Sequence, residues 1–269
     1  MAVHAHPDDE SSSTGGVLAR YADEGVRTVV VTCTNGELGD APGGIKPGES
    51  GHDETEVARI RLGELERACE TLGVAHLELL GYHDSGMVDW ADKDRPDVFC
   101  NVAVSDAVER LSSLFEEYKP DVVITYDALG GYDHPDHLHA SRAAVAAVKA
   151  TGIPSKLYLT AMRRSRWAEM WQALKEAGQE VPDFGEIDEE AVRRMDESEA
   201  RITTTVDIRP EMDRKNKALR AHASQIEESW FSKIPPEVAV KIFGDETFIR
   251  AMDRTGAPVP ETDLFAGLR

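Results

Sequence analysis

Residues 26–34 read VRTVVVTCT, and this stretch decides the fold class. The run is too short and too continuously apolar for an amphipathic helix, and it is typical of a strand buried on both faces. Comparable runs occur at residues 76–80, 121–126 (DVVITY) and 156–161. Because strands buried on both faces belong to sheets that helices cover on either side, these runs predict a mostly parallel sheet.

Segments with helical composition separate the expected strands. They are residues 14–24, 54–72, 104–118 and 138–150. Gly25 and Gly73 each follow one of these segments, as expected for a glycine just beyond the C-terminus of a helix. The alternation predicts an α/β fold with a Rossmann-like sheet and helices on both faces. Ligands of such sheets bind outside the carboxyl ends of the strands, so polar clusters at these ends are candidate sites.

The chain after residue 161 has a different character. Its segments in order are a helix at 163–178, an acidic helical face or lid at 184–200, a strand at 202–208 and a helix at 213–225. Aromatic residues among prolines near the end predict short helices packed on the main body: Trp230, Phe231, Phe243 and Phe248. We expect one domain over residues 1–269, with an α/β core at 1–161 and a C-terminal elaboration at 162–269.

The composition excludes several kinds of partner. The 269 residues include 50 acidic and 30 basic ones, and the resulting charge of −20 repels nucleic acid and anionic membranes. No apolar run approaches the roughly 18 residues of a membrane span, and the opening MAVH predicts no secretory signal. Three widely spaced cysteines fit a reducing compartment, so we expect a cytoplasmic protein. The oligomeric state stays open, and a homo-oligomer is compatible with the sequence.

A polar cluster at residues 4–10 (HAHPDDE) directly follows a very short apolar start. Glu10 alone could be an ordinary acidic residue at a helix N-terminus, where the helix dipole favours carboxylates. His6, Asp8 and Asp9 together have no such simple explanation, because a helix start needs one capping side chain. These three residues therefore indicate a functional site.

A second cluster, made of residues 126–127 (YD) and 130–139 (GGYDHPDHLH), lies at and after the end of the strand expected at 121–126, so both clusters should meet at the carboxyl edge of the sheet. A catalytic zinc ion has about three His or carboxylate ligands and one position for water, whose pKa it lowers to around 7. His6, Asp9 and His137 satisfy this ligand count. Asp8 then remains as the candidate general base.

Both clusters resemble the motifs of the LmbE/PIG-L family of zinc-dependent N-deacetylases, with HPDDE at residues 6–10 and GGYDHPDH at 130–137. Residues 32–37 (TCTNGE), 80–87 (LGYHDSGM) and 221–226 (AHASQI) are similar to further segments of the family, the last in its actinobacterial branch. The relatives there are the mycothiol-biosynthesis deacetylase, which acts on N-acetylglucosaminyl-inositol, and the mycothiol S-conjugate amidase. The similarity covers most of the chain.

The resemblance implies one zinc ion per chain on His6, Asp9 and His137, although another divalent metal would also suit such a mixed nitrogen and oxygen site. It makes Asp8 the base that deprotonates the attacking water. The strand expected before the first motif has only residues 1–3, which is short for the family, so truncation of the N-terminus stays open.

The resemblance also implies roles for three residues of the second cluster. His134 would stabilise the oxyanion or protonate the leaving amine, and Tyr132 would help to polarise the amide carbonyl. Asp136 could hydrogen-bond an active-site histidine and fix its tautomer. Asp133 departs from the pattern that we expect between Tyr132 and His134, and it adds negative charge near the pocket.

Other polar residues are candidates for lining a pocket that binds the sugar of the substrate. The candidates are His83, Asp84, Ser85 and His222. The first three follow the strand expected at 76–80, which brings them to the same edge of the sheet. Arg59 and Arg61 are by default ordinary helix charges, although an arginine could contact a hydroxylated or phosphorylated substrate.

The leading hypothesis is an enzyme that removes an N-acetyl group from a small molecule that contains GlcNAc. Cleavage of a mycothiol S-conjugate at the same nitrogen, or tailoring of a natural product, stays open because these activities share the metal motifs. A metal-binding or sugar-binding protein without catalysis is disfavoured, since it would need neither Asp8 nor Tyr132 and His134. A dinucleotide-dependent oxidoreductase is also disfavoured, because residues 14–16 (TGG) lack the required glycine pattern.

Overall fold

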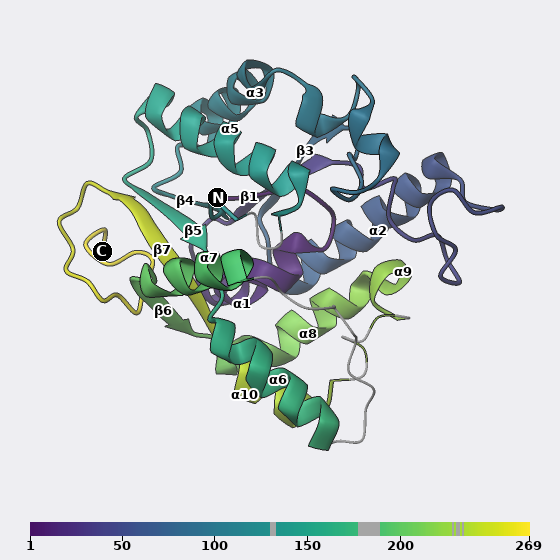
Figure 1. Ribbon diagram of the computed structural model, residues 1–269. Helices are drawn as coiled ribbons and strands as arrows, with labels where there is room; N and C mark the ends of the chain where they lie inside the picture. Colours follow the sequence, from purple (N-terminus) through teal and green to yellow (C-terminus); the bar gives the residue numbers. More distant parts are fainter. Residues whose placement is uncertain (130–132, 177–188, 228, 230–231, 233) are drawn as a thin grey trace.

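The computed structural model describes residues 1–269 except 130–132, 177–188, 228, 230–231 and 233. Among the described residues, seven strands form one sheet in the order β3-β2-β1-β4-β5-β7-β6 (Figure 1). The strands are β1 Ala2–His4, β2 Val29–Thr34, β3 His76–Tyr82, β4 Val122–Tyr126, β5 Lys156–Thr160, β6 Thr204–Asp207 and β7 Asp245–Asp253. Strands β1 to β5 run parallel, whereas β7 runs antiparallel to both β5 and β6.

Helices cover both faces of this sheet, which confirms the predicted α/β class (Figure 1). They are α1 Asp9–Asp23, α2 Glu54–Leu72, α3 Val104–Tyr118, α5 Pro135–Thr151, α6 Arg164–Glu176, α7 Glu189–Ala200, α8 Met212–Ala221, α9 Ala223–Ile226 and α10 Pro236–Phe243, with short 3-10 turns at Ala91–Asp94, Phe99–Asn101 and Arg209–Glu211. Among the described residues, no helix combines the length and the apolarity that a bilayer crossing requires.

Two hydrophobic cores lie on opposite faces of the sheet. One contains side chains of α1, α2 and α8, and the other contains side chains of α3 and α5. Successive residues of a strand alternate between them: Ala2 joins the first core and Val3 the second. All three residues of β1 are buried, because β1 is a central strand with helices above and below.

The C-terminal part of the chain differs from the expectation. Phe248 was expected in a short helix, but it lies fully buried in β7, which pairs with β5 along their length. The sheet therefore continues across the division expected at residues 161 and 162. Phe243 does end a short helix, α10. Trp230 and Phe231 lie outside the described residues.

The order of the strands determines where a ligand can bind. The chain runs outward from β1 through β2 to β3 on one side, and then returns to β4 on the other side of β1. The connections after β1 and β4 therefore leave toward opposite faces of the sheet, since α1 packs in one core and α5 in the other. The ends of two such strands are where α/β sheets bind their ligands. Both polar clusters of the sequence follow these two strands, so the fold brings them to one place.

Candidate active site

Three ligand atoms converge at the carboxyl ends of β1 and β4. His6 follows β1, Asp9 begins α1, and His137 lies in the first turn of α5. His6 Nδ1 lies 3.2 Å from His137 Nε2 and 3.4 Å from Asp9 Oδ2, and the third side of the triangle, from His137 Nε2 to Asp9 Oδ2, is 3.3 Å. All three side chains are buried. The fold thus joins residues that are 131 positions apart in the sequence.

This triangle suits a divalent metal ion. Three ligands placed about 2.0–2.1 Å from a tetrahedral ion lie about 3.3–3.4 Å from one another, which agrees with the measured sides. Two imidazole nitrogens and one carboxylate oxygen form a donor set that zinc accepts and that other divalent metals share. Two other groups of side chains have ligand atoms within 4.8 Å of one another and could also hold an ion: His6, His134 and His137, and His6, Asp84 and Asp136.

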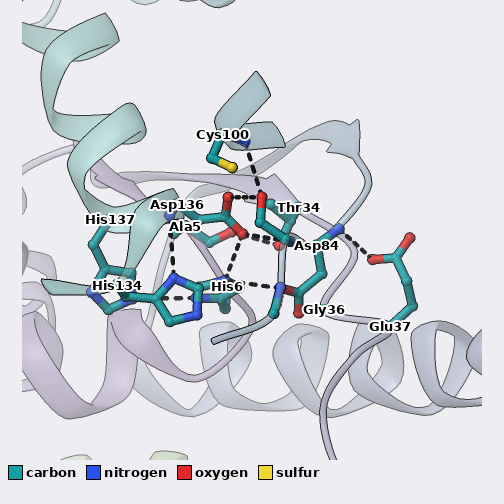
Figure 2. A network of polar contacts seen from close by, with 12 residues as sticks. Ala5, His6, Thr34, Gly36, Glu37, Asp84, Cys100, His134, Asp136 and His137 are labelled. Carbon is teal, nitrogen blue, oxygen red and sulfur yellow. Dashed lines mark hydrogen bonds and ion pairs between the residues drawn. The ribbon is translucent and has the colours of Figure 1, made fainter. Parts of the chain in front are cut away.

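The opposite nitrogen of His6 is held by carboxylates. Figure 2 shows Asp136 and Asp84 beside this ring, with Asp136 Oδ2 at 3.2 Å and Asp84 Oδ1 at 3.6 Å from His6 Nε2. Burial lowers the pKa of His6, but these carboxylates outweigh it and raise the pKa well above the ordinary value. A carboxylate on the far nitrogen fixes the tautomer and the orientation of a histidine ligand.

Ser85 holds the Asp136 carboxylate with two hydrogen bonds. Its backbone N–H donates to Asp136 Oδ2 at 2.9 Å, and its hydroxyl donates to Asp136 Oδ1. The expectation that Ser85 contacts a substrate is therefore replaced by a supporting role, because the residue is fully buried and both of its donors are used. Asp84 is also buried and accepts the N–H of Gly86 at 2.8 Å.

Asp8 lies at the entrance to α1 in an unusual backbone conformation. Its φ is 118°, a value that L-amino acids rarely adopt. The Arg61 guanidinium donates to Asp8 Oδ2 at 3.1 Å, while Oδ1 accepts no hydrogen bond from the part of the chain that the structure describes. Burial raises the pKa of Asp8 to about 6, although the positive charge of Arg61 opposes the rise.

The default expectation for Arg61, an ordinary helix charge, is wrong, and contact of an arginine with the substrate stays a prediction. The side chain is buried, and it also donates to the carbonyls of Pro7 at 2.6 Å and Gly36 at 2.7 Å. Gly36 has to be a glycine here, because a Cβ would lie 2.5 Å from Arg61 Nη1. Arg59 does remain on the surface, paired with Glu56.

Tyr126, the last residue of β4 and the first of the second cluster, contacts two of the three ligand residues. Its hydroxyl accepts the N–H of Ala5 at 2.7 Å and donates to Asp9 Oδ2 at 2.7 Å. Its ring stacks on His137, with centroids 4.2 Å apart. Burial favours a higher pKa for Asp9, but His137 and His6 hold it well below its ordinary value, so Asp9 is a carboxylate.

His134 caps the N-terminus of α5. Its Nδ1 accepts the N–H of Asp136 at 3.2 Å, which leaves the proton of the neutral ring on Nε2. Burial, with His6 and His137 adding to it, lowers the pKa of His134 to about 2, so the ring is neutral. Tyr132 lies outside the described residues. The charge of Asp133 is paired with Arg194 of α7, at 2.8 and 3.3 Å.

The remaining candidates for the sugar pocket separate into two places. His83 is partly exposed at the rim, where its Nε2 lies 3.1 Å from Glu54 Oε2. His222 is fully buried, and its Nε2 lies 2.8 Å from Glu10 Oε1. His222 was expected to contact a substrate, but its side chain has no exposed surface and bonds to Glu10.

Comparison with known proteins gives consistent matches. Residues 1–148 match the family model described as PIG-L, GlcNAc-PI de-N-acetylase. A protein of Acidothermus cellulolyticus called 1D-myo-inositol 2-acetamido-2-deoxy-alpha-D-glucopyranoside deacetylase is 40% identical, over 100% of this chain and 94% of its own. A protein of the same name from Saccharomonospora viridis is 39% identical, over 99% of each chain.

Among solved structures, the N,N'-diacetylchitobiose deacetylase of Pyrococcus horikoshii has a similar fold. Its TM-score is 0.61 at 20% identity, and the match covers 93% of this chain and 82% of that one. The similarity extends well beyond the residues of the family model, so the C-terminal strands belong to the shared fold.

Proposed function

Because the chain belongs to the PIG-L family of GlcNAc-PI de-N-acetylases, we propose that its substrate is N-acetylglucosaminyl-inositol, from which it removes the acetyl group. Membership makes it an N-deacetylase, a hydrolase that acts on a non-peptide amide bond. The choice of substrate is supported by the full-length relatives, which are called deacetylases of this inositol glycoside and are 39 and 40% identical to this chain. The three free cysteines support a reducing, cytoplasmic location.

One observation carries the proposal of a metal site. The ligand atoms of His6, Asp9 and His137 form a triangle with sides of 3.2 to 3.4 Å. Asp9 is a better third ligand than His134, because His134 Nδ1 already accepts a backbone N–H. We take the ion to be zinc, one per chain. When bound, a divalent ion of this kind supplies Lewis acidity toward the amide carbonyl and the attacking water.

Asp8 serves as the general base. Its Oδ2 is held by Arg61, and Oδ1 is left to accept the proton of the water that attacks the acetamide carbonyl. A pKa of about 6 suits this task, because a base works best when its pKa lies near the operating pH.

His134 stabilises the developing oxyanion. With Nδ1 accepting the N–H of Asp136, the neutral ring presents Nε2–H as a hydrogen-bond donor. A ring that stays neutral fits this role better than proton donation to the leaving amine. Tyr132 would add a second donor to the carbonyl oxygen, as the resemblance to the family implies. Asp136 keeps His6 in one tautomer through Nε2.

The test is release of primary amine from N-acetylglucosaminyl-inositol by the zinc-loaded protein, compared with the Asp8→Ala variant. Loss of a general base typically costs about 10²–10⁴-fold in rate, so we expect the variant to lose at least about 100-fold in kcat and to keep one metal ion per chain. Glu56→Gln is the matched control, because Glu56 is an exposed carboxylate that pairs with Arg59 on the surface of α2.

Two results would contradict the proposal. An Asp8→Ala variant that turns over as fast as the parent protein removes Asp8 from the mechanism. A parent protein that holds one metal ion but releases no amine from this substrate is not its deacetylase, and mycothiol conjugates and acylated natural products would be assayed next.

A further inference from the structure

His222 and Glu10 form a fully buried pair between the C-terminal half of the chain and the first motif. His222 Nε2 lies 2.8 Å from Glu10 Oε1, and neither side chain has measurable exposure. Burial disfavours a charged ring, but Glu10 outweighs it and raises the pKa of His222. A buried ion pair is weak evidence for stability, since removing two charges from water is costly. A contribution to stability therefore does not by itself explain why this pair is buried here.

The other oxygen of Glu10 reaches back to the backbone of Asp8. Glu10 Oε2 accepts the N–H of Asp8 at 3.0 Å. This N–H belongs to the residue whose φ is 118°, and a backbone in such a region persists only where its surroundings hold it. Glu10 supplies a fixed acceptor for it, and His222 fixes Glu10 in turn.

The residues that follow His222 hold two further elements around Asp8. Ser224 donates its N–H and its hydroxyl to the two oxygens of Glu64, at 2.8 and 2.7 Å. Glu64 is one helical turn beyond Arg61 on α2, and both are buried. This contact thus fixes the helix that delivers the Arg61 guanidinium to Asp8.

Gln225 makes the third contact, with the loop after β2. Its side-chain amide accepts the N–H of Asp40 at 3.1 Å and donates to the Asp40 carbonyl at 2.9 Å. The same loop carries Gly36, whose carbonyl accepts from Arg61. The backbone of Asp8, the helix of Arg61 and the loop that receives Arg61 are therefore all held by residues 222–225.

We propose that residues 222–225 are a positioning segment for the general base, with His222 acting through Glu10 to hold Asp8 in its working conformation; this inference rests on the base role proposed above. His222 and Glu10 are positioning residues, because the described contacts lead from them to Asp8. The segment explains why a histidine, a serine and a glutamine stand together just after α8, at the start of and within α9.

The test is a double-mutant cycle between His222→Ala and Asp8→Ala, with kcat, KM and metal content measured for each protein. A displacement of a catalytic group by about 1 Å can cost about 100-fold in rate. We expect His222→Ala to lower kcat by 10- to 100-fold, estimated on that basis, with KM and the metal content unchanged. In the Asp8→Ala background the same substitution should have no further effect, because the group that it positions is gone.

Two conservative variants guard against simple misfolding. Glu10→Gln keeps an oxygen for the Asp8 N–H but loses the charge that holds His222, so it should fall between the parent protein and His222→Ala in kcat. His222→Gln keeps an N–H donor and should recover part of the rate. Glu261→Gln is the control for stability, since it breaks a buried ion pair with Lys156 in a different part of the sheet. It should lower the Tm and leave kcat unchanged.

The inference is overturned if His222→Ala lowers kcat equally in both backgrounds, leaves kcat unchanged, or raises KM alone, which would indicate direct contact with the substrate. If Asp8→Ala itself retains full activity, the proposed function fails first. A crystal structure of His222→Ala gives a readout that does not depend on turnover. Asp8 should leave its positive φ and its contact with Arg61, and an unmoved Asp8 would contradict the inference.

Discussion

Replacing Asp136 by Asn should weaken metal binding while leaving the metal ligands in place. The Asp136 carboxylate is fully buried and accepts three hydrogen bonds, from His6 Nε2 and from the N–H and hydroxyl of Ser85. An asparagine offers one acceptor oxygen, and its NH₂ group can only donate. If the amide oxygen replaces Oδ2, the NH₂ group faces the Ser85 hydroxyl, which already accepts the Cys100 N–H and must turn to accept a second time. In either orientation of the amide, His6 Nε2 loses its charged partner.

The size of the effect follows from these contacts. A hydrogen bond to a charged group, such as the one from His6 Nε2 to the Asp136 carboxylate, contributes about 1.5–3 kcal/mol. Removing the hydrogen-bond partner of a metal-binding histidine typically costs about 10- to 100-fold in metal affinity, or about 1.4–2.8 kcal/mol. The two values agree, so we expect the Kd for zinc to rise by about 10- to 100-fold.

The assay is competition for zinc between the protein and a chromophoric chelator at constant pH. Asp127→Asn is the matched control, because Asp127 is also a buried carboxylate after β4 but bonds to Ser198 and Leu129. It should lower the Tm without changing the Kd. If Asp136→Asn binds zinc within about twofold of the parent protein, the hydrogen bond from His6 to Asp136 does not tune the metal site.

Two further predictions concern stability. Gly16→Ala should lower the free energy of unfolding by at least about 1 kcal/mol, because the new Cβ would lie 2.6 Å from the Cβ of Ile208 and this overpacking exceeds the gain in helix propensity. Thermal unfolding measures the effect. Gly63→Ala is the control, since its new Cβ would meet the end of the Arg67 side chain at 3.3 Å, and it should raise the Tm instead. Burial favours a higher pKa for Glu261, but Lys156 and the other donors hold it below the ordinary value, so its stabilisation is complete above about pH 4.3 and is lost as the pH falls through the lower folded pKa. In urea unfolding, the deficit of Glu261→Gln should therefore be largest near neutral pH and shrink in acid, and a deficit that grows in acid would refute the assignment.

The elements with regular periodicity could be predicted from the sequence. Helices α2 and α3 have the expected bounds, because both have a clear apolar stripe and α2 ends at Gly73, which adopts a φ of 76°. The meeting of the two motifs was also predictable, since the ends of parallel strands share one edge of a sheet. Strand β7 was not predicted, because aromatic residues among prolines gave no clear alternation.

Arg61 and Tyr126 show why part of the site could not be predicted. Arg61 stands four residues after Val57 on the apolar stripe of α2, and this position was the available signal that it is buried. Its acceptors include the backbone carbonyls of Pro7 and Gly36, and residue types alone do not indicate a contact with a backbone carbonyl. Tyr126 stands at the start of the second cluster, but its bond to Asp9 could not be predicted, since a tyrosine at the end of a buried strand is also ordinary core material.

The late position of β7 in the sequence has a consequence for synthesis on the ribosome. A nascent chain that ended at Gly244 would already carry His6, Asp8, Asp9 and His137, the residues of the proposed chemistry. It would nevertheless leave β5 with an open edge and deprive β6 of its neighbour in the sheet. Unpaired edges of this kind recruit other chains. A premature stop before residue 245 should thus yield an aggregate, and the enzyme cannot be shortened to its motifs.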